Sequence, residues 1–154
     1  MGGRKRKGLL VAVLAIALVA AACSDDSSTS GSSSPSEGET GSTASVNATV
    51  KDFAIGLDTE AAASGEVKFI VTNDGPSEHE FVVLETDLAP DALPVENGVA
   101  NEDAEGISNA GEVEDLASGD TNSLTLTLEP GTYVVVCNLP GHYEKGMYSA
   151  FTVT

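Results

Sequence analysis

The side chains of this chain that are best suited to metal binding are few and lie close to the ends of its predicted strands. The sequence of 154 residues contains two histidines, two cysteines and two methionines. Cys137, His142 and Met147 form a Cys-x4-His-x4-Met pattern within one predicted loop, and His79 lies upstream at the start of another predicted strand. Such a loop can bring a thiolate, an imidazole and a thioether to one point, where His79 can complete the set.

Copper is the metal that this combination of ligands favours. Thiolate and thioether groups favour Cu(I), imidazole suits both Cu(I) and Cu(II), and two histidines with one cysteine and a weak methionine form a type 1 electron-transfer site. Zinc could bind the two histidines and the cysteine, but a structural zinc site needs a fourth strong ligand in place of a thioether. Taken alone, a cysteine at a strand end is usually a small buried hydrophobic residue, and only the combination makes metal binding the better hypothesis.

The elements that must position these residues are predicted to be β-strands. Alternating or continuous apolar patterns mark strands near 46–50, 53–57, 67–71, 79–86, 124–128, 132–137 and 149–154. The continuous apolar run at 133–136 is typical of a strand that is covered on both faces. The alternation reverses its phase near Asp52, which predicts a bulge or a bend. About seven to eight strands without helical periodicity predict an all-β, antiparallel β-sandwich.

One segment of the predicted domain, Asp87–Asp120, departs from this pattern. It is rich in acidic residues and contains no lysine, arginine or aromatic residue. We expect a surface excursion with a helical turn near Asp91 and a short strand at 111–116. Its acidity either serves solubility or forms a docking face for a basic partner.

The N-terminal segment predicts export. Basic residues at 4–7 precede an apolar run at 9–22, which suits a signal peptide (1–22) and is shorter than the roughly 20 residues of a spanning helix. Small residues before Cys23 resemble a bacterial lipoprotein processing site, so Cys23 is predicted to be lipidated. Secretion with an unmodified Cys23 and an uncleaved anchor are the alternatives. The Ser-rich segment 23–45 is predicted to be a flexible linker, which leaves 46–154 as the folded domain.

The charge of the chain limits the partners that it can have. The formal net charge is −17, and without the first 22 residues only three lysines remain against all 24 acidic residues. Nucleic-acid binding and a polybasic membrane patch both require basic residues. The composition therefore excludes both classes of partner for the folded domain.

Two segments of the sequence, Asn73-Asp-Gly-Pro-Ser-Glu-His79-Glu-Phe81 and Cys137-Asn-Leu-Pro-Gly-His142-Tyr-Glu-Lys-Gly-Met147, carry a resemblance to a known family. They resemble the cupredoxin family of type 1 blue copper proteins, in particular its plastocyanin-, auracyanin- and sulfocyanin-like members, over residues 46–154. The resemblance implies a Greek-key β-sandwich or barrel, one Cu(I)/Cu(II) ion and one-electron transfer between redox proteins. It implies that the imidazoles of His79 and His142, the thiolate of Cys137 and the axial thioether of Met147 bind the metal. The long Cys-to-His spacing and the acidic segment depart from the plastocyanin pattern and leave the partner open.

The resulting hypothesis is a monomeric electron carrier, held by a lipid anchor on the outer face of the cell membrane. Leu139, Pro140 and Tyr143 are expected to form an apolar surface around the edge of His142, where redox partners approach. Asn73 either ties the upstream loop to the ligand region or serves a simple turn, and Glu80 is expected to be a solvated strand residue. A copper-delivery protein is the alternative function. An enzyme is disfavoured because no histidine remains for a second metal centre and four protein ligands would fill the first.

Overall fold

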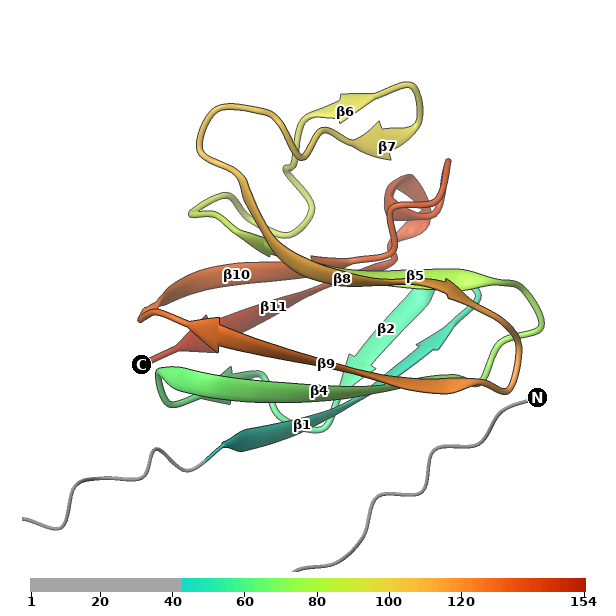
Figure 1. Ribbon diagram of the computed structural model, residues 1–154. Helices are drawn as coiled ribbons and strands as arrows, with labels where there is room; N and C mark the ends of the chain where they lie inside the picture. The colour runs from blue at the N-terminus through green and yellow to red at the C-terminus, as the bar shows by residue number, and fades with distance from the viewer. Residues whose placement is uncertain (1–42) are drawn as a thin grey trace, which may run out of the picture. The chain divides into compact units, whose positions relative to one another are not determined.

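The computed structural model describes residues 43–154, which form two β-sheets packed face to face as a sandwich (Figure 1). The first sheet has the strand order β2-β1-β4-β9, the second has the order β3-β11-β10-β5-β8, and β6 pairs with β7 alone. The strands are β1 Ala44–Lys51, β2 Ala54–Leu57, β3 Ala61–Ala62, β4 Gly65–Asn73, β5 His79–Glu85, β6 Val95–Glu96, β7 Val99–Ala100, β8 Ser108–Leu116, β9 Thr121–Leu128, β10 Gly131–Val136 and β11 Tyr148–Val153. The predicted all-β sandwich is confirmed.

The strand pairing is mainly antiparallel, as predicted, and two pairs depart from this by being parallel. β1 pairs in parallel with β4, and β11 pairs in parallel with β3. The first parallel pair arises because the β1–β2 hairpin returns the chain to the end where β1 began, and β4 then starts from that same end. Eight strands have four or more residues, in agreement with the predicted number, and β3, β6 and β7 have two each.

The reversal of alternation near Asp52 marks a hairpin and not the predicted bulge or bend. β1 and β2 pair antiparallel with Lys51 opposite Ala54, so Asp52 and Phe53 alone form the turn between them. Phe53 has a φ of 61°, a backbone conformation that bulky residues rarely adopt. The turn lies at the end of the sandwich where β5 begins, and both of its residues contact the candidate site described below.

The main core fills the space between the two sheets. It contains the inward-facing side chains of both, among them Val46, Val50, Val67, Phe69, Val71, Phe81, Val83, Val135 and Phe151. A second, smaller core lies on the outer face of β5 and β10 and contains Val82, Leu84, Leu93, Ala100, Val134, Val136 and Tyr143. β5 and β10 are therefore covered on both faces, as the continuous apolar run predicted for β10.

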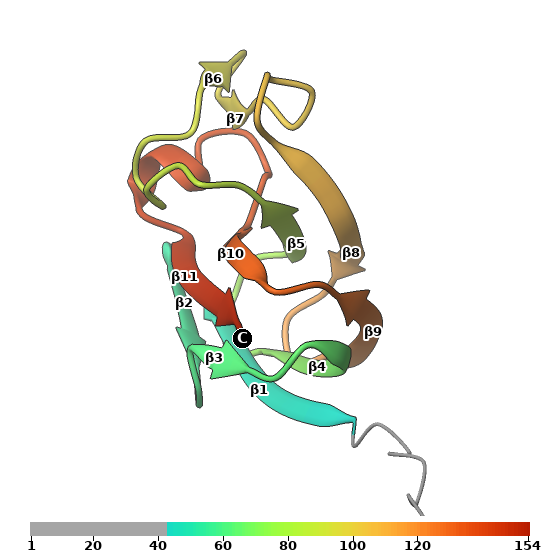
Figure 2. The ribbon, with the colours of Figure 1, turned by 90° about the vertical axis from the view of Figure 1, so that its left-hand side faces the viewer.

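The cover over the outer face of β5 and β10 comes from the acidic segment, whose residues 87–107 we call the strap. It contains the β6–β7 hairpin and lies on the far side of the second sheet from β1 and β4 (Figure 2). A hydrogen bond from Ala92 N–H to the Ala89 carbonyl forms a β-turn where a helical turn was expected near Asp91. The strand expected at 111–116 begins earlier, at Ser108, and forms the edge of the second sheet.

The predicted signal peptide, the Cys23 lipidation site and most of the predicted linker lie outside the described residues. β1 begins at Ala44, two residues before the predicted start of the folded domain. Over residues 43–154, the structure contains no helix of the length and apolar character needed to cross a membrane.

Candidate metal centre

Three of the predicted metal-binding side chains meet at one end of the sandwich. The Nδ1 atoms of His79 and His142 lie 3.3 Å apart. The Sγ of Cys137 lies 3.7 Å from Nδ1 of His79 and 3.3 Å from Nδ1 of His142. Within the described part of the chain, these residues are the one group of three or more His, Cys, Asp or Glu side chains whose ligand atoms lie within 4.8 Å of one another.

The spacing of these three atoms fits a single first-row metal ion. A point equidistant from atoms separated by 3.3, 3.3 and 3.7 Å lies about 2 Å from each of them. Metal–imidazole bonds of about 2.0–2.1 Å and metal–thiolate bonds of about 2.3 Å are typical of zinc, and the observed triangle meets both with small adjustments. Two imidazoles and a thiolate with a nearby thioether are a donor set that copper prefers.

Met147, the fourth predicted ligand, is a neighbour of Cys137 across the β10–β11 pair. The Cys137 N–H donates to the Met147 carbonyl at 3.0 Å, and the Met147 N–H donates to the His142 carbonyl at 3.2 Å. Met147 is fully buried and belongs to the same core cluster as Cys137. Its backbone is thus tied to the backbones of two other predicted ligands, and its thioether lies in the interior.

The loop that joins β10 to β11 is closed by its own hydrogen bonds. The His142 N–H donates to the Leu139 carbonyl at 2.9 Å, and a short 3-10 helix, η1 (Tyr143–Lys145), follows. Gly146 ends this helix with a φ of 102°, a conformation that favours glycine. The Cys-x4-His-x4-Met spacing therefore fits one compact turn between two paired strands.

The thiol of Cys137 is fully buried and unpaired with any other cysteine of the described residues. Burial raises its pKa, while backbone N–H groups of Glu80 and Leu139 that point at the sulfur oppose this rise. The Glu80 N–H lies 3.5 Å from Sγ. The thiol is thus protonated at neutral pH without a metal, and metal binding must displace that proton.

His79 is fully buried at the start of β5, and its ring contacts a polar group through Nε2, the nitrogen that points away from Cys137 and His142. Its Nε2 lies 3.1 Å from Oδ1 of Asp52 in the β1–β2 turn. Gly75 lies against the same ring, because a Cβ at this position would be 3.1 Å from Nε2 and 3.0 Å from the Asp52 nitrogen. Any larger residue at position 75 would force these groups apart.

Asn73 both forms a turn and ties the upstream loop to the sheets, so the structure shows the two roles that the sequence left open. Its side chain is completely buried; Oδ1 accepts from Gly75 N–H, and Nδ2 donates to the carbonyls of Ser77 and Leu116. These bonds join the loop before His79 to the end of β8. Asn73 thereby fixes the position from which β5 begins.

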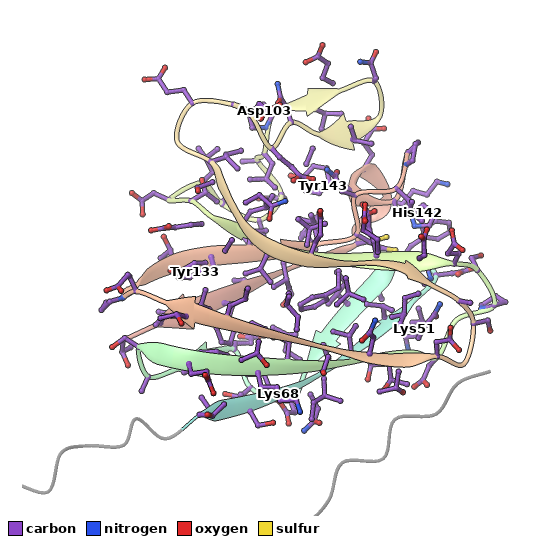
Figure 3. All side chains as sticks on the ribbon, in the orientation of Figure 1. Lys51, Lys68, Asp103, Tyr133, His142 and Tyr143 are labelled. Atoms are coloured by element: carbon purple, nitrogen blue, oxygen red, sulfur yellow. The ribbon has the colours of Figure 1, made fainter. Side chains whose placement is uncertain are left out.

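His142 lies in the loop at the same end of the sandwich and is only partly buried (Figure 3). Burial lowers its pKa, and the nearby His79 and Lys145 lower it further, so the neutral imidazole needed by a metal is favoured. The ring of Phe53 contacts His142 edge-to-face at 5.6 Å between centroids, and Nζ of Lys145 lies 4.3 Å from the centre of the Phe53 ring. Phe53 is 42% exposed, so an aromatic side chain adjoins His142 at the surface.

The sequence prediction for Tyr143 is wrong, because this residue faces inward. It is 4% exposed and packs in the second core against the ring of Tyr148. Its hydroxyl accepts from Leu93 N–H at 2.8 Å and donates to the Pro90 carbonyl at 2.9 Å. Tyr143 therefore fastens the ligand loop to the strap, while Leu139 and Pro140 keep partial or full exposure.

The strap is fastened to the ligand loop at two further points. Oδ1 of Asn138 accepts from Ala100 N–H at 2.6 Å, and its Nδ2 donates to the Ala100 carbonyl at 2.9 Å and to Oε1 of Glu102 at 2.7 Å. The Gly141 N–H donates to the Gly98 carbonyl at 2.7 Å. Much of the acidic segment is thus a structural cover for the Cys-His-Met loop.

Glu80 is half-buried and not the solvated strand residue that was expected. Burial raises its pKa to about 7, opposed by a hydrogen bond from the Asn138 backbone N–H and reinforced by the negative charges of Glu102, Glu112 and Glu114. A carboxyl group with a pKa near neutrality therefore lies directly beside the candidate site.

Comparisons with known proteins agree with this geometry. The family model described as "Sulfocyanin (SoxE) domain" matches residues 41–154. Auracyanin-B of Chloroflexus aurantiacus is 48% identical over 40 residues, which are 25% of this chain and 17% of that protein. The chain thus covers only a small part of this relative's length.

Solved structures share the fold at lower sequence identity. Reduced auracyanin from Roseiflexus castenholzii has a TM-score of 0.55 and 22% identity, covering 74% of this chain and 99% of its own. A rusticyanin structure has a TM-score of 0.56 and 19% identity, covering 73% of this chain and 77% of its own. At these identities the likeness is one of fold.

Proposed function

Because this chain belongs to the sulfocyanin (SoxE) domain family of cupredoxins, whose cofactor is one copper ion, we propose that it carries single electrons between redox partners. The proposed ligands are Nδ1 of His79, Sγ of Cys137, Nδ1 of His142 and the thioether of Met147. When bound there, copper supplies one-electron chemistry between its Cu(I) and Cu(II) states. The observation that carries the proposal is the convergence of two imidazole nitrogens and one thiolate sulfur within 3.7 Å of one another.

The residues of the chain suit this role because backbone and side-chain hydrogen bonds hold the ligand loop in place. Cys137 and Met147 are hydrogen-bonded across a strand pair, and the strap holds the loop between them from outside. A site whose ligands scarcely move is compatible with both oxidation states, and little reorganisation then accompanies electron transfer. The lowered pKa of His142 keeps its imidazole available as a neutral ligand.

Electrons are proposed to enter and leave through the exposed edge of His142. His79 and Cys137 are fully buried, whereas His142 is partly exposed and has Phe53 and Lys145 beside it. A partner that approaches this end reaches a ligand ring directly. Docking of a basic redox partner on the acidic segment Asp87–Asp120 is part of the same proposal.

Tethering to the outer face of the membrane remains a proposal on the N-terminal sequence. Lipidation of Cys23 would anchor the chain, and a flexible Ser-rich segment between Cys23 and the start of β1 at Ala44 would span roughly 25 Å. Such a tether would let the domain reorient between partners.

An electron carrier suits the site better than an enzyme or a copper-delivery protein. The chain has only two histidines, and both belong to the one proposed centre. Delivery favours an exposed, exchangeable site, whereas His79, Cys137 and Met147 are completely buried. We therefore propose a non-enzymatic carrier that acts as a monomer.

The visible absorption spectrum tests this function. Adding Cu(II) to the purified protein should produce an intense blue absorption, and Cys137→Ser should abolish it because the thiolate is lost. Cys23→Ser is the matched control and should leave the colour unchanged, since residue 23 precedes the predicted domain of residues 46–154. A blue protein that survives Cys137→Ser would show that the assignment is wrong.

A further inference from the structure

The β1–β2 turn supplies a carboxylate to the ring of the buried histidine, a contact that no local pattern of the sequence predicts. Asp52 and Phe53 are the two residues of the turn, and they contact the rings of His79 and His142 respectively. One tight turn thus touches both imidazoles of the proposed copper centre. Phe53 adopts its unfavourable φ of 61° at this point, and such strained residues cluster at functional sites.

The contact between Asp52 and His79 selects one form of the imidazole. An ionised carboxylate can only accept hydrogen bonds, so Nε2 of His79, at 3.1 Å from Oδ1, must carry the proton. In the neutral ring, Nδ1 is then free of a proton, and this is the atom that faces His142 and Cys137. The hydrogen bond therefore sets the tautomer and the orientation that a metal ligand needs.

The carboxylate itself is fixed in place. Its second oxygen, Oδ2, accepts from the Ser77 hydroxyl at 3.1 Å. Gly75 permits the close approach, because a Cβ there would lie 3.0 Å from both the Asp52 nitrogen and the Lys51 Cα. The side chain of Asp52 is 35% exposed while that of His79 is 0% exposed, so the negative charge lies at the boundary between solvent and the buried ring.

We propose that Asp52 is a positioning residue of the copper centre: it holds Nδ1 of His79 toward the metal, and its negative charge favours the oxidised state. This inference rests on the proposed function. The oxidised centre carries one more positive charge than the reduced centre, so a nearby fixed anion stabilises it preferentially. Partial exposure of Asp52 to solvent weakens the effect without removing it.

The charge component is tested by the midpoint potential of Asp52→Asn. The amide is nearly isosteric and its oxygen still accepts a hydrogen bond, so mainly the charge is lost. We expect the equilibrium to shift toward the reduced ion by roughly three- to tenfold, a rise of about 30–60 mV at about 59 mV per tenfold. Asp74→Asn is the matched control, because Asp74 is exposed in the β4–β5 loop, next to Gly75, and makes no side-chain hydrogen bond within residues 43–154. A shift in Asp52→Asn no larger than that of Asp74→Asn, or of opposite sign, would overturn the charge component.

The positioning component is tested without copper, by ¹⁵N NMR of the two histidine side chains in the metal-free protein. Wild type should show His79 as the Nε2–H tautomer, Asp52→Ala should show a mixture, and Asp52→Glu should restore the wild-type pattern. An unchanged Nε2–H tautomer in a folded Asp52→Ala protein, or the Nδ1–H tautomer in wild type, would overturn it. The NMR measurement does not depend on the proposed function. The proposed function is refuted by a different result, namely that the wild-type protein takes up copper without turning blue.

Discussion

Replacing Asn138 by alanine should destabilise the metal-free protein strongly, because this side chain joins the strap to the ligand loop. The change removes three hydrogen bonds, two of them to the backbone of Ala100, which is 1% exposed. A net hydrogen bond contributes about 0.5–1.5 kcal/mol, and a buried group left unpaired costs about 1–3 kcal/mol. We therefore expect the free energy of unfolding to fall by about 2–4 kcal/mol.

Urea denaturation of the metal-free protein measures this loss. Asn101→Ala is the matched control, since Asn101 lies on the strap and its side-chain bonds, to Glu96 and to Asp103 N–H, are exposed. The control should change the stability by less than about 1 kcal/mol. If Asn138→Ala stays within about 0.5 kcal/mol of wild type, the strap does not hold the ligand loop through Asn138.

Two further predictions concern the residues next to the proposed ligands. The pKa of Glu80 is raised from 4.5 to about 7 in the folded protein. Between pH 4.5 and about 7, the folded protein therefore keeps a proton on Glu80 that the unfolded chain has released. The free energy of unfolding should thus fall as the pH rises from about 4.5 to about 7. Glu80→Gln should flatten this dependence in urea unfolding by up to about 2 kcal/mol after allowance for screening; identical pH slopes in both proteins would contradict the assignment. Met147→Leu should retain the blue colour and raise the midpoint potential measured by redox titration, because a weak thioether donor to the metal would be lost. An unchanged or lower potential would argue against Met147 as a ligand.

The strands and three converging residues could be predicted from the sequence because their signals are local. Alternating hydrophobic residues determine strands such as β4 and β9 directly, and the continuous apolar run of β10 indicates burial on both faces. His79, Cys137 and His142 were identifiable because rare side chains lay at strand ends. The start of β5 and the end of β10 meet at one end of the sandwich because these two strands are antiparallel.

The contacts around the site could not be predicted, because they depend on how distant segments meet. The reversal of hydrophobic alternation near Asp52 does not reveal whether the chain bends or turns back. The carboxylate of Asp52 reaches His79 only because the chain forms a hairpin there. The strap has no hydrophobic periodicity that would predict its position. Its backbone at Ala100 is bound by the side-chain amide of Asn138, which donates and accepts as a neighbouring strand would. Tyr143 could have faced either way from its turn, and the second core that buries it exists only once the strap has folded over β5 and β10.

The position of copper in a crystal of the loaded protein is the decisive test of the proposed ligand set. Anomalous scattering at the copper absorption edge should give one strong peak about 2 Å from Nδ1 of His79, Nδ1 of His142 and Sγ of Cys137, the point that the spacing of these atoms defines. A single peak elsewhere in the protein, or copper bound without the Cys137 sulfur, would rule out this ligand set.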